Sequence, residues 1–89
     1  MKLEGRIAIV TGSGGGFGEG IAKHFAELGA SVLVADIRGQ EAERVAAEIN
    51  ATGRKAVAAD IDVTKTDQVA RMVALALSSF GKQIGRAHV

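Results

Sequence analysis

The stretch VTGSGGGFGEG, from Val10 to Gly20, decides how this chain folds. Six of the ten residues from Thr11 onward are glycine, and they follow directly on a run of β-branched residues. Inside a regular element, glycine costs about 0.5–1 kcal/mol relative to alanine. A chain that concentrates this cost at one point needs a backbone path there that side chains would obstruct.

The composition predicts one small globular domain. The chain has 89 residues, of which 47% are hydrophobic and 24% charged, and its net charge is +1. This balance gives no electrostatic reason to expect nucleic acid or an anionic membrane as a partner. No apolar run approaches the roughly 18 residues that span a bilayer. Without cysteine there is no disulfide framework and no thiolate metal site, and we expect a cytoplasmic protein.

Strand and helix patterns alternate on both sides of the glycines. Strand patterns cover Arg6 to Thr11, Ser31 to Asp36 and Ala56 to Ile61, and helix patterns cover Gly18 to Leu28, Gln40 to Thr52 and Thr66 to Phe80. The apolar stripes that we expect to be buried are Ile21, Ala22, Phe25 and Leu28, then Ala42, Val45, Ala46 and Ile49, then Val69, Val73, Ala76 and Phe80. Thr66 suits the N-cap of the third helix.

This alternation predicts an α/β fold with a parallel sheet covered by helices on both faces. The strands lack polar alternation, as strands buried on both sides do. Right-handed crossovers then place the third strand beside the second and the second beside the first. The predicted architecture is the βαβαβα portion of a Rossmann-like doubly wound parallel sheet.

In this architecture the glycines join the first strand to the first helix, where ligands of doubly wound sheets bind. A helix N-terminus offers free N–H groups and a partial positive charge, both of which suit a phosphate. The spacing is Thr11-Gly12-x-x-x-Gly16-x-Gly18. It is neither the six-residue dinucleotide fingerprint nor a triphosphatase loop, which needs a following lysine. The alternative is a flexible glycine-rich connection.

That spacing resembles the cofactor loop of the short-chain dehydrogenase/reductase family. The resemblance extends from about Leu3 to Gly81 and includes Ala35-Asp36, Asp62-Val63-Thr64 and Phe80-Gly81. It implies a site for NAD or NADP and hydride transfer between the cofactor and an alcohol or ketone. The residues that it places at the phosphates and adenosine are Gly12, Ser13, Gly16, Phe17 and Gly18, with Asp62 and Val63 beside the adenine.

Asp36 favours NAD over NADP. It ends the second strand, 18 residues after Gly18, where an acid accepts hydrogen bonds from the ribose hydroxyls of NAD and repels the extra phosphate of NADP. Arg38 is close enough to reach that phosphate, and we count it among the cofactor-binding candidates. The alternatives are a solvated acid at the end of a strand for Asp36 and a solvated loop charge for Arg38.

The catalytic residues that the resemblance implies are missing. The family's proton donor is a tyrosine, followed four residues later by lysine and assisted by a serine and an asparagine. This sequence contains no tyrosine, and its single asparagine, Asn50, falls in the second helix pattern. We therefore expect a chain that binds the cofactor and has no catalytic site. The full-length parent would act on a small alcohol or ketone, and we expect it to be a homo-oligomer.

The end of the chain departs from the family's pattern. We interpret residues 1–82 as a truncated dinucleotide-binding domain and residues 83–89 as a non-native tail, because IGRAHV looks like the translation of a sequencing adapter. Without a fourth strand, the first strand is expected to have an unpaired apolar edge and the tail to make few contacts.

Other polar residues carry weaker signals. His24 and His88 have no second metal ligand at helical spacing and are interpreted as surface residues. Asp60 and Asp62 stand two residues apart at the adenine side, which does not favour acid–base catalysis. Two further classes of protein remain as alternatives: a methyltransferase that binds S-adenosylmethionine, and a non-enzymatic dinucleotide sensor. The first is disfavoured because no acid directly precedes Gly12.

Overall fold

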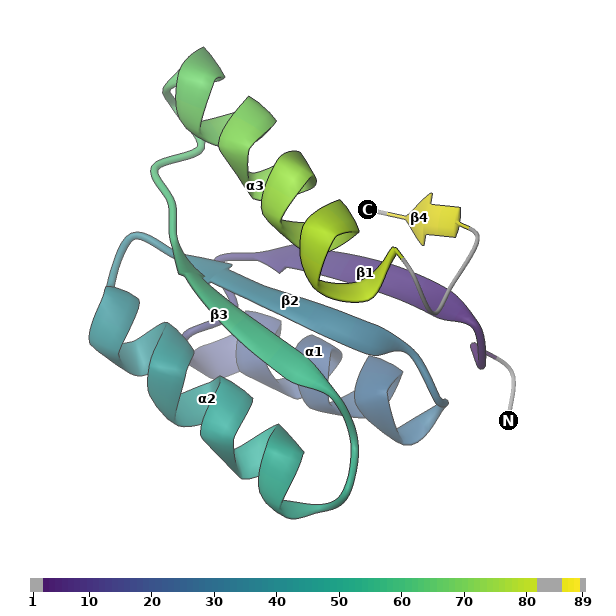
Figure 1. Cartoon of the computed structure of the whole chain (residues 1–89). Helices are drawn as coiled ribbons and strands as arrows, with labels where there is room; N and C mark the ends of the chain where they lie inside the picture. Colours follow the sequence, from purple (N-terminus) through teal and green to yellow (C-terminus); the bar gives the residue numbers. More distant parts are fainter. Residues whose placement is uncertain (1–2, 82–85, 89) are drawn as a thin grey trace.

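The computed structural model describes residues 3–81 and 86–88. Strands and helices alternate along the chain, as the sequence predicts (Figure 1). The elements are β1 (Arg6–Thr11), α1 (Gly16–Glu27), β2 (Ser31–Asp36), α2 (Gly39–Ala51), β3 (Ala56–Asp60), α3 (Thr66–Phe80) and β4 (Arg86–His88). None of the helices within residues 3–81 has the length and apolar character needed to cross a lipid bilayer.

The four strands form one parallel sheet in the order β3-β2-β1-β4. Helices α1 and α2 cover one face, and α3 lies across the other (Figure 1). The predicted doubly wound sheet and its third–second–first strand order are therefore confirmed. Because the strands are parallel, the carboxyl ends of β1, β2 and β3 meet at one edge, and the glycine stretch leaves β1 at that edge.

The core consists of two apolar layers separated by the sheet. Strand β2 is buried along its whole length, and its side chains alternate between the layers. Val32 and Val34 pack on the side of α1 and α2, whereas Leu33 and Ala35 pack on the side of α3. Burying each Val or Leu side chain contributes about 1.5–3 kcal/mol, so β2 is the main apolar anchor of the fold.

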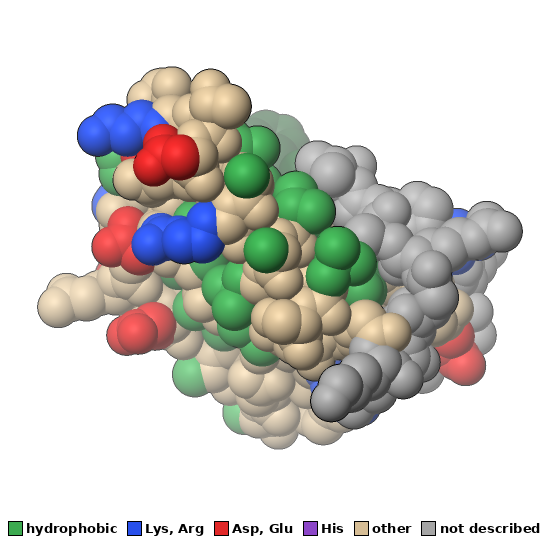
Figure 2. Space-filling model, turned by 45° about the horizontal axis from the view of Figure 1, so that its top comes forward, with side chains coloured by type: hydrophobic (Ala, Val, Ile, Leu, Met, Phe, Trp, Pro, Cys, Tyr) green, Lys and Arg blue, Asp and Glu red, His purple; other side chains and the backbone are tan. Residues whose placement is uncertain are grey.

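The helix stripes agree with the predictions in α2 and only in part elsewhere. All four expected residues of α2 are buried. In α1 the buried residues are Ala22 and Ala26, while Phe25 and Leu28 are half-buried and Ile21, on the flank of the stripe, stays 42% exposed. Met72 joins the buried residues of α3, and Leu77 stays 49% exposed. Figure 2, in which the α3 side of the molecule is turned forward, shows hydrophobic side chains at the surface.

Two expectations about helix and sheet ends were wrong. Lys65, not Thr66, occupies the N-cap of α3, and no side chain caps that helix end. The edge of β1 is also not unpaired along its whole length. Strand β4 pairs with its first half in parallel, with Arg6 opposite Arg86 and Ala8 opposite His88. The N–H and C=O groups at the edge of a strand can pair with an extended segment of any sequence. Residues 83–85 and 89 of the expected tail lie outside the described residues.

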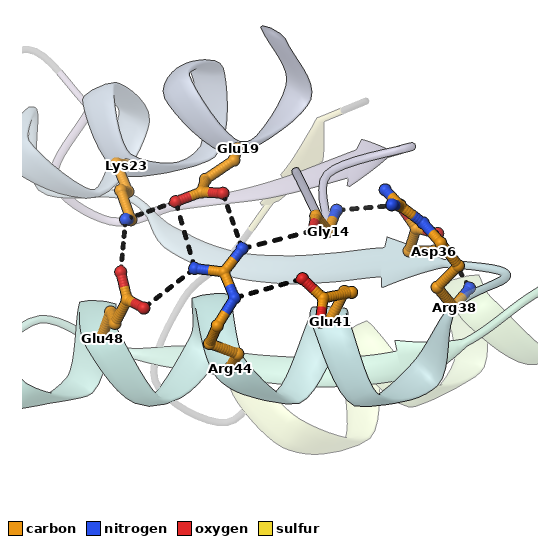
Figure 3. Close-up of polar contacts among 8 residues, drawn as sticks. All are labelled: Gly14, Glu19, Lys23, Asp36, Arg38, Glu41, Arg44 and Glu48. Carbon is orange, nitrogen blue, oxygen red and sulfur yellow. Dashed lines mark hydrogen bonds and ion pairs between the residues drawn. The ribbon is translucent and has the colours of Figure 1, made fainter. Parts of the chain in front are cut away.

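An ion-pair network joins α1 to α2 (Figure 3). The guanidinium of Arg44 lies 2.9 Å from a carboxylate oxygen of Glu19 and 2.9 Å from one of Glu48. Lys23 Nζ lies 2.6 Å from each of the same two carboxylates. The hydrogen bonds from Arg44 and Lys23 lower the pKa of Glu19 to about 2 and also lower the pKa of Glu48.

This network predicts acid sensitivity. Both carboxyl groups have folded pKa values below their ordinary value of 4.5, so their stabilising effect is complete above about pH 5 and is lost as the pH falls towards 2. We expect the urea midpoint of unfolding to fall over this range. Glu19→Gln should lower the midpoint at pH 7 and flatten its pH dependence. Glu43→Gln, an exposed change on α2 outside the network, should do neither, and equal behaviour of the two variants would contradict the prediction.

Candidate cofactor-binding site

The glycine loop turns sharply from β1 into α1. Gly12 and Gly16 have φ angles of +64° and +55°, in the left-handed region that favours glycine. A Cβ atom at Gly18 would lie 2.1 Å from the carbonyl oxygen of Gly12 and 2.9 Å from the Cα of Ser13. The first turn of α1 therefore packs directly on the backbone of the loop, and this contact requires glycine at position 18.

The N-terminus of α1 opens at the same edge. Gly15 is its N-cap, and no side chain forms a capping hydrogen bond there. The first N–H groups of the helix consequently carry the positive end of its dipole without an internal partner. Phe17 lies in this first turn and is 92% exposed. An anion can approach this helix end past Gly12 and Gly16, where the space beside the backbone is open.

The side chain of Ser13 is buried under the glycine loop, and the contact of Ser13 with a cofactor stays a prediction. Its hydroxyl is fully buried, donates a hydrogen bond to the Val10 carbonyl oxygen at 2.5 Å and accepts one from the Ala35 N–H at 3.1 Å. Its N–H also donates to the Ala35 carbonyl at 3.1 Å. The hydrogen bonds of Ser13 thus connect the end of β1 to the end of β2 and fix the start of the glycine loop.

Asp36 is buried, with 6% of its surface exposed, so the alternative of a solvated acid does not apply. Its Oδ2 accepts the N–H of Gly14 at 2.9 Å, and its Oδ1 accepts the N–H of Arg38 at 2.8 Å (Figure 3). Burial raises the pKa of Asp36, but the hydrogen bonds from Arg38 and Gly14 outweigh it, and the pKa lies below its ordinary value. A fixed, ionised carboxylate therefore stands beside the glycine loop.

The side chain of Arg38 folds back over this carboxylate. Its Nε lies 3.2 Å from Asp36 Oδ1, although 59% of the side chain remains exposed. A Cβ atom at Gly15 would lie 3.3 Å from the guanidinium, so Arg38 also covers part of the loop. Arg38 is thus an ion-pair partner of Asp36, and its exposed guanidinium stands at the rim of the site.

The turn between β3 and α3 carries the predicted adenine-side residues. The Asp62 carboxylate accepts the Thr64 N–H at 3.0 Å and the Thr64 hydroxyl at 2.6 Å, and these bonds lower its pKa. The N–H of Asp62 donates to Gln68 Oε1 at 2.7 Å. Val63, which stands between Asp62 and Thr64 in the sequence, is 51% exposed. The structure brings the glycine loop, Asp36 and this turn to one edge of the sheet, and their contact with a cofactor stays a prediction.

Sequence reasoning missed two residues of this edge. A Cβ atom at Gly14 would lie 2.9 Å from Asp36 Oδ2, so Gly14 is the glycine that lets the carboxylate reach the loop. Ile37 is 65% exposed directly after Asp36. An isoleucine between two charged residues at a strand end was a signal in the sequence, because an exposed apolar side chain there suits a planar ligand. Nothing in the sequence distinguished Gly14 from its neighbouring glycines.

The weaker candidates stay outside the site. His24 is a surface residue of α1, 3.9 Å from Glu27, with 66% of its side chain exposed. Within residues 3–81, no three metal-ligating side chains gather at one point. Asp60 faces the α2 N-terminus, where a Cβ atom at Gly39 would lie 3.2 Å from its carboxylate.

A parallel, doubly wound sheet with a glycine-rich first turn and an acid at the end of the second strand defines a dinucleotide-binding fold of the Rossmann type. The model of the short chain dehydrogenase family matches residues 6–84 of this chain. The chain belongs to that family, as its glycine spacing indicates.

The relatives are dehydrogenases and reductases. The chain is 40% identical over 82 residues to 7alpha-hydroxysteroid dehydrogenase of Escherichia coli K12, and 44% identical over 83 residues to versicolorin reductase 1 of Dothistroma septosporum. Each alignment covers 92% of this chain and 32% of the relative. The chain therefore spans about a third of the length of the curated relatives that it matches.

Solved structures show the same fold. A hydroxysteroid dehydrogenase from Escherichia coli superimposes with a TM-score of 0.88 at 37% identity, over 97% of this chain and 36% of that enzyme. A 7 alpha-hydroxysteroid dehydrogenase in complex with NADH and 7-oxo glycochenodeoxycholic acid gives a TM-score of 0.87 at 40% identity, over 90% and 31%. That neighbour and the family match support a nicotinamide dinucleotide as the cofactor of this fold.

The packing of α1 on the loop predicts opposite effects for two glycine substitutions. Gly18→Ala forces a methyl group onto the Gly12 carbonyl and should destabilise the fold by about 1–3 kcal/mol. Gly20→Ala, in the same helix, meets nothing within 4 Å and should stabilise it by up to about 1 kcal/mol. Urea unfolding followed by circular dichroism measures both. A Gly18→Ala midpoint equal to or above that of the parent would contradict the close contact.

Proposed function

We propose that this chain is the cofactor-binding part of an NAD-dependent oxidoreductase that transfers hydride between NAD and an alcohol or ketone. The observation that carries the proposal is the buried Asp36 carboxylate, held 2.9 Å from the Gly14 N–H beside an uncapped helix N-terminus. A dinucleotide needs an anion site and a ribose site next to each other, and this edge of the sheet provides both.

The residues present fit a dinucleotide. The N–H groups of the first turn of α1, beginning at Gly16, would hold the pyrophosphate. Asp36 would accept hydrogen bonds from the adenosine ribose in place of the two longer ones from the Arg38 side chain, at 3.2 and 3.5 Å. Ile37 and Val63, both more than half exposed, would flank the adenine with apolar surface. When bound, the nicotinamide ring supplies or accepts the hydride.

The buried charge of Asp36 supports NAD rather than NADP. Its lowered pKa keeps it ionised at neutral pH, and a 2′-phosphate in this place would meet a fixed negative charge. Arg38 neutralises part of that charge from the solvent side. Accommodating NADP would require Arg38 to leave Asp36 and pair with the phosphate, which would leave the buried carboxylate without its ion-pair partner.

We expect Asp36→Ala to weaken NAD binding by roughly 10- to 100-fold, the equivalent of one charge-assisted hydrogen bond of about 1.5–3 kcal/mol. NADP should lose little or gain, because the repulsive charge is removed and Arg38 is free to bind its phosphate. In that background, Arg38→Ala should weaken NADP more than NAD. Calorimetric titration of both cofactors measures these effects.

Glu27→Ala removes an exposed acid from the last turn of α1, at the opposite end of that helix from the glycine loop, and is the matched control. Because Asp36 also holds Gly14 and the turn after β2, each variant is first compared with the parent by urea unfolding. A parent that binds NADP more tightly than NAD, or an unchanged NAD affinity in folded Asp36→Ala, would contradict the assignment.

The 89-residue chain itself should not turn over substrate, since it contains no tyrosine to act as the proton donor that the family resemblance implies. Absorbance at the wavelength of reduced nicotinamide should stay constant when the purified chain is mixed with NAD and simple secondary alcohols. An Escherichia coli hydroxysteroid dehydrogenase assayed beside it shows that the conditions support turnover. Turnover that persists through repeated purification would refute this expectation.

A further inference from the structure

Gln68 holds the turn that follows β3 from the first turns of α3. Its side-chain oxygen accepts the N–H of Asp62 at 2.7 Å, and Gln68 itself is half-buried. One helical turn further on, Arg71 donates to the carbonyl of Asp60 at 2.8 Å. Two side chains of α3 therefore fix the backbone on either side of Ile61, a buried residue of the core.

The other hydrogen bonds of Asp62 are local, from Thr64 and from the Lys65 N–H. The Asp62 carboxylate is bound to the N–H and hydroxyl of Thr64, which fixes its orientation but does not connect the turn to the rest of the fold. Val63 is half exposed and Thr64 exposed. In the described part of the chain, one side chain forms a hydrogen bond to the backbone of Asp62 or Val63. This side chain is Gln68, and it belongs to another element, α3.

We propose that Gln68 is a positioning residue for the adenine end of the cofactor site. The role rests on the proposed function, because it has meaning only where Asp62 and Val63 meet a nucleotide. With the Asp62 N–H bound to Gln68, the peptide groups of the turn keep one orientation, and the Val63 side chain keeps its place at the edge. A turn held in this way loses less conformational freedom when a ligand binds, which favours binding.

The chemistry of the bond separates the informative variants. Gln68 acts as an acceptor, so Gln68→Glu retains the function through a carboxylate oxygen and Gln68→Ala removes it. Gln40→Ala is the matched control, because Gln40 lies exposed in the first turn of α2, on the other face of the sheet from α3. Each variant is first shown to be folded by urea unfolding.

The first measurement is binding by calorimetry of NAD, ADP and nicotinamide mononucleotide. Gln68→Ala should weaken NAD and ADP by a similar factor of about 3 to 10, the effect of one hydrogen bond, and leave nicotinamide mononucleotide unchanged. Gln68→Glu and Gln40→Ala should stay close to the parent. Equal affinities of the parent and Gln68→Ala for NAD would overturn the positioning role, as would an equal loss for nicotinamide mononucleotide.

The second measurement, hydrogen exchange of the Asp62 amide, needs no ligand. The amide should exchange faster in Gln68→Ala and at the parental rate in Gln68→Glu. Unchanged protection in Gln68→Ala would overturn the inference.

The proposed function and the positioning role of Gln68 can be refuted separately. A parent that binds none of the adenine-containing ligands refutes the proposed function and the positioning role with it. A parent that binds NAD, with Gln68→Ala binding equally well, refutes the positioning role alone.

Discussion

The contact between Gly18 and the Gly12 carbonyl is the constraint on which the rest of the site depends. A helix that starts this close to the strand it follows leaves no room for side chains between them, and a Cβ atom at Gly18 would stand 2.1 Å from that oxygen. The loop must therefore bend through two left-handed glycines, Gly12 and Gly16. This path brings Gly14 against the end of β2 and leaves the N–H groups of α1 at the sheet edge.

The periodic features of the chain could be predicted from the sequence because they follow from burial. The strand patterns, the four buried residues of α2 and the sheet order depend on apolar spacing and crossover handedness, both of which are local or general. The glycine spacing and Asp36 could also be recognised in the sequence, because each of these positions requires a particular residue type.

The features that the sequence did not show depend on distances between elements. Ser13 could not be assigned to the β1–β2 junction, because its hydroxyl bonds a residue 22 positions away. Gly14 and Gln68 act on Asp36 and Asp62 through contacts that no spacing rule describes. The pairing of Arg86–His88 with β1 was missed because these residues did not match the family's pattern, whereas an edge strand accepts partners through its backbone and not its sequence.

Gly14 connects the ligand site to the surface charges that join α1 and α2. Its N–H donates to the buried Asp36 carboxylate at 2.9 Å, and its carbonyl lies 3.5 Å from Arg44, the centre of the ion-pair network (Figure 3). The first bond is short and buried, while the second is long and only partly buried, so Asp36 contributes most of the orientation. A negative group at the N–H and a positive group at the carbonyl align the loop backbone in one direction. Glycine is required between them, because a Cβ atom would stand 3.0 Å from Glu41 Cβ and closer still to Asp36.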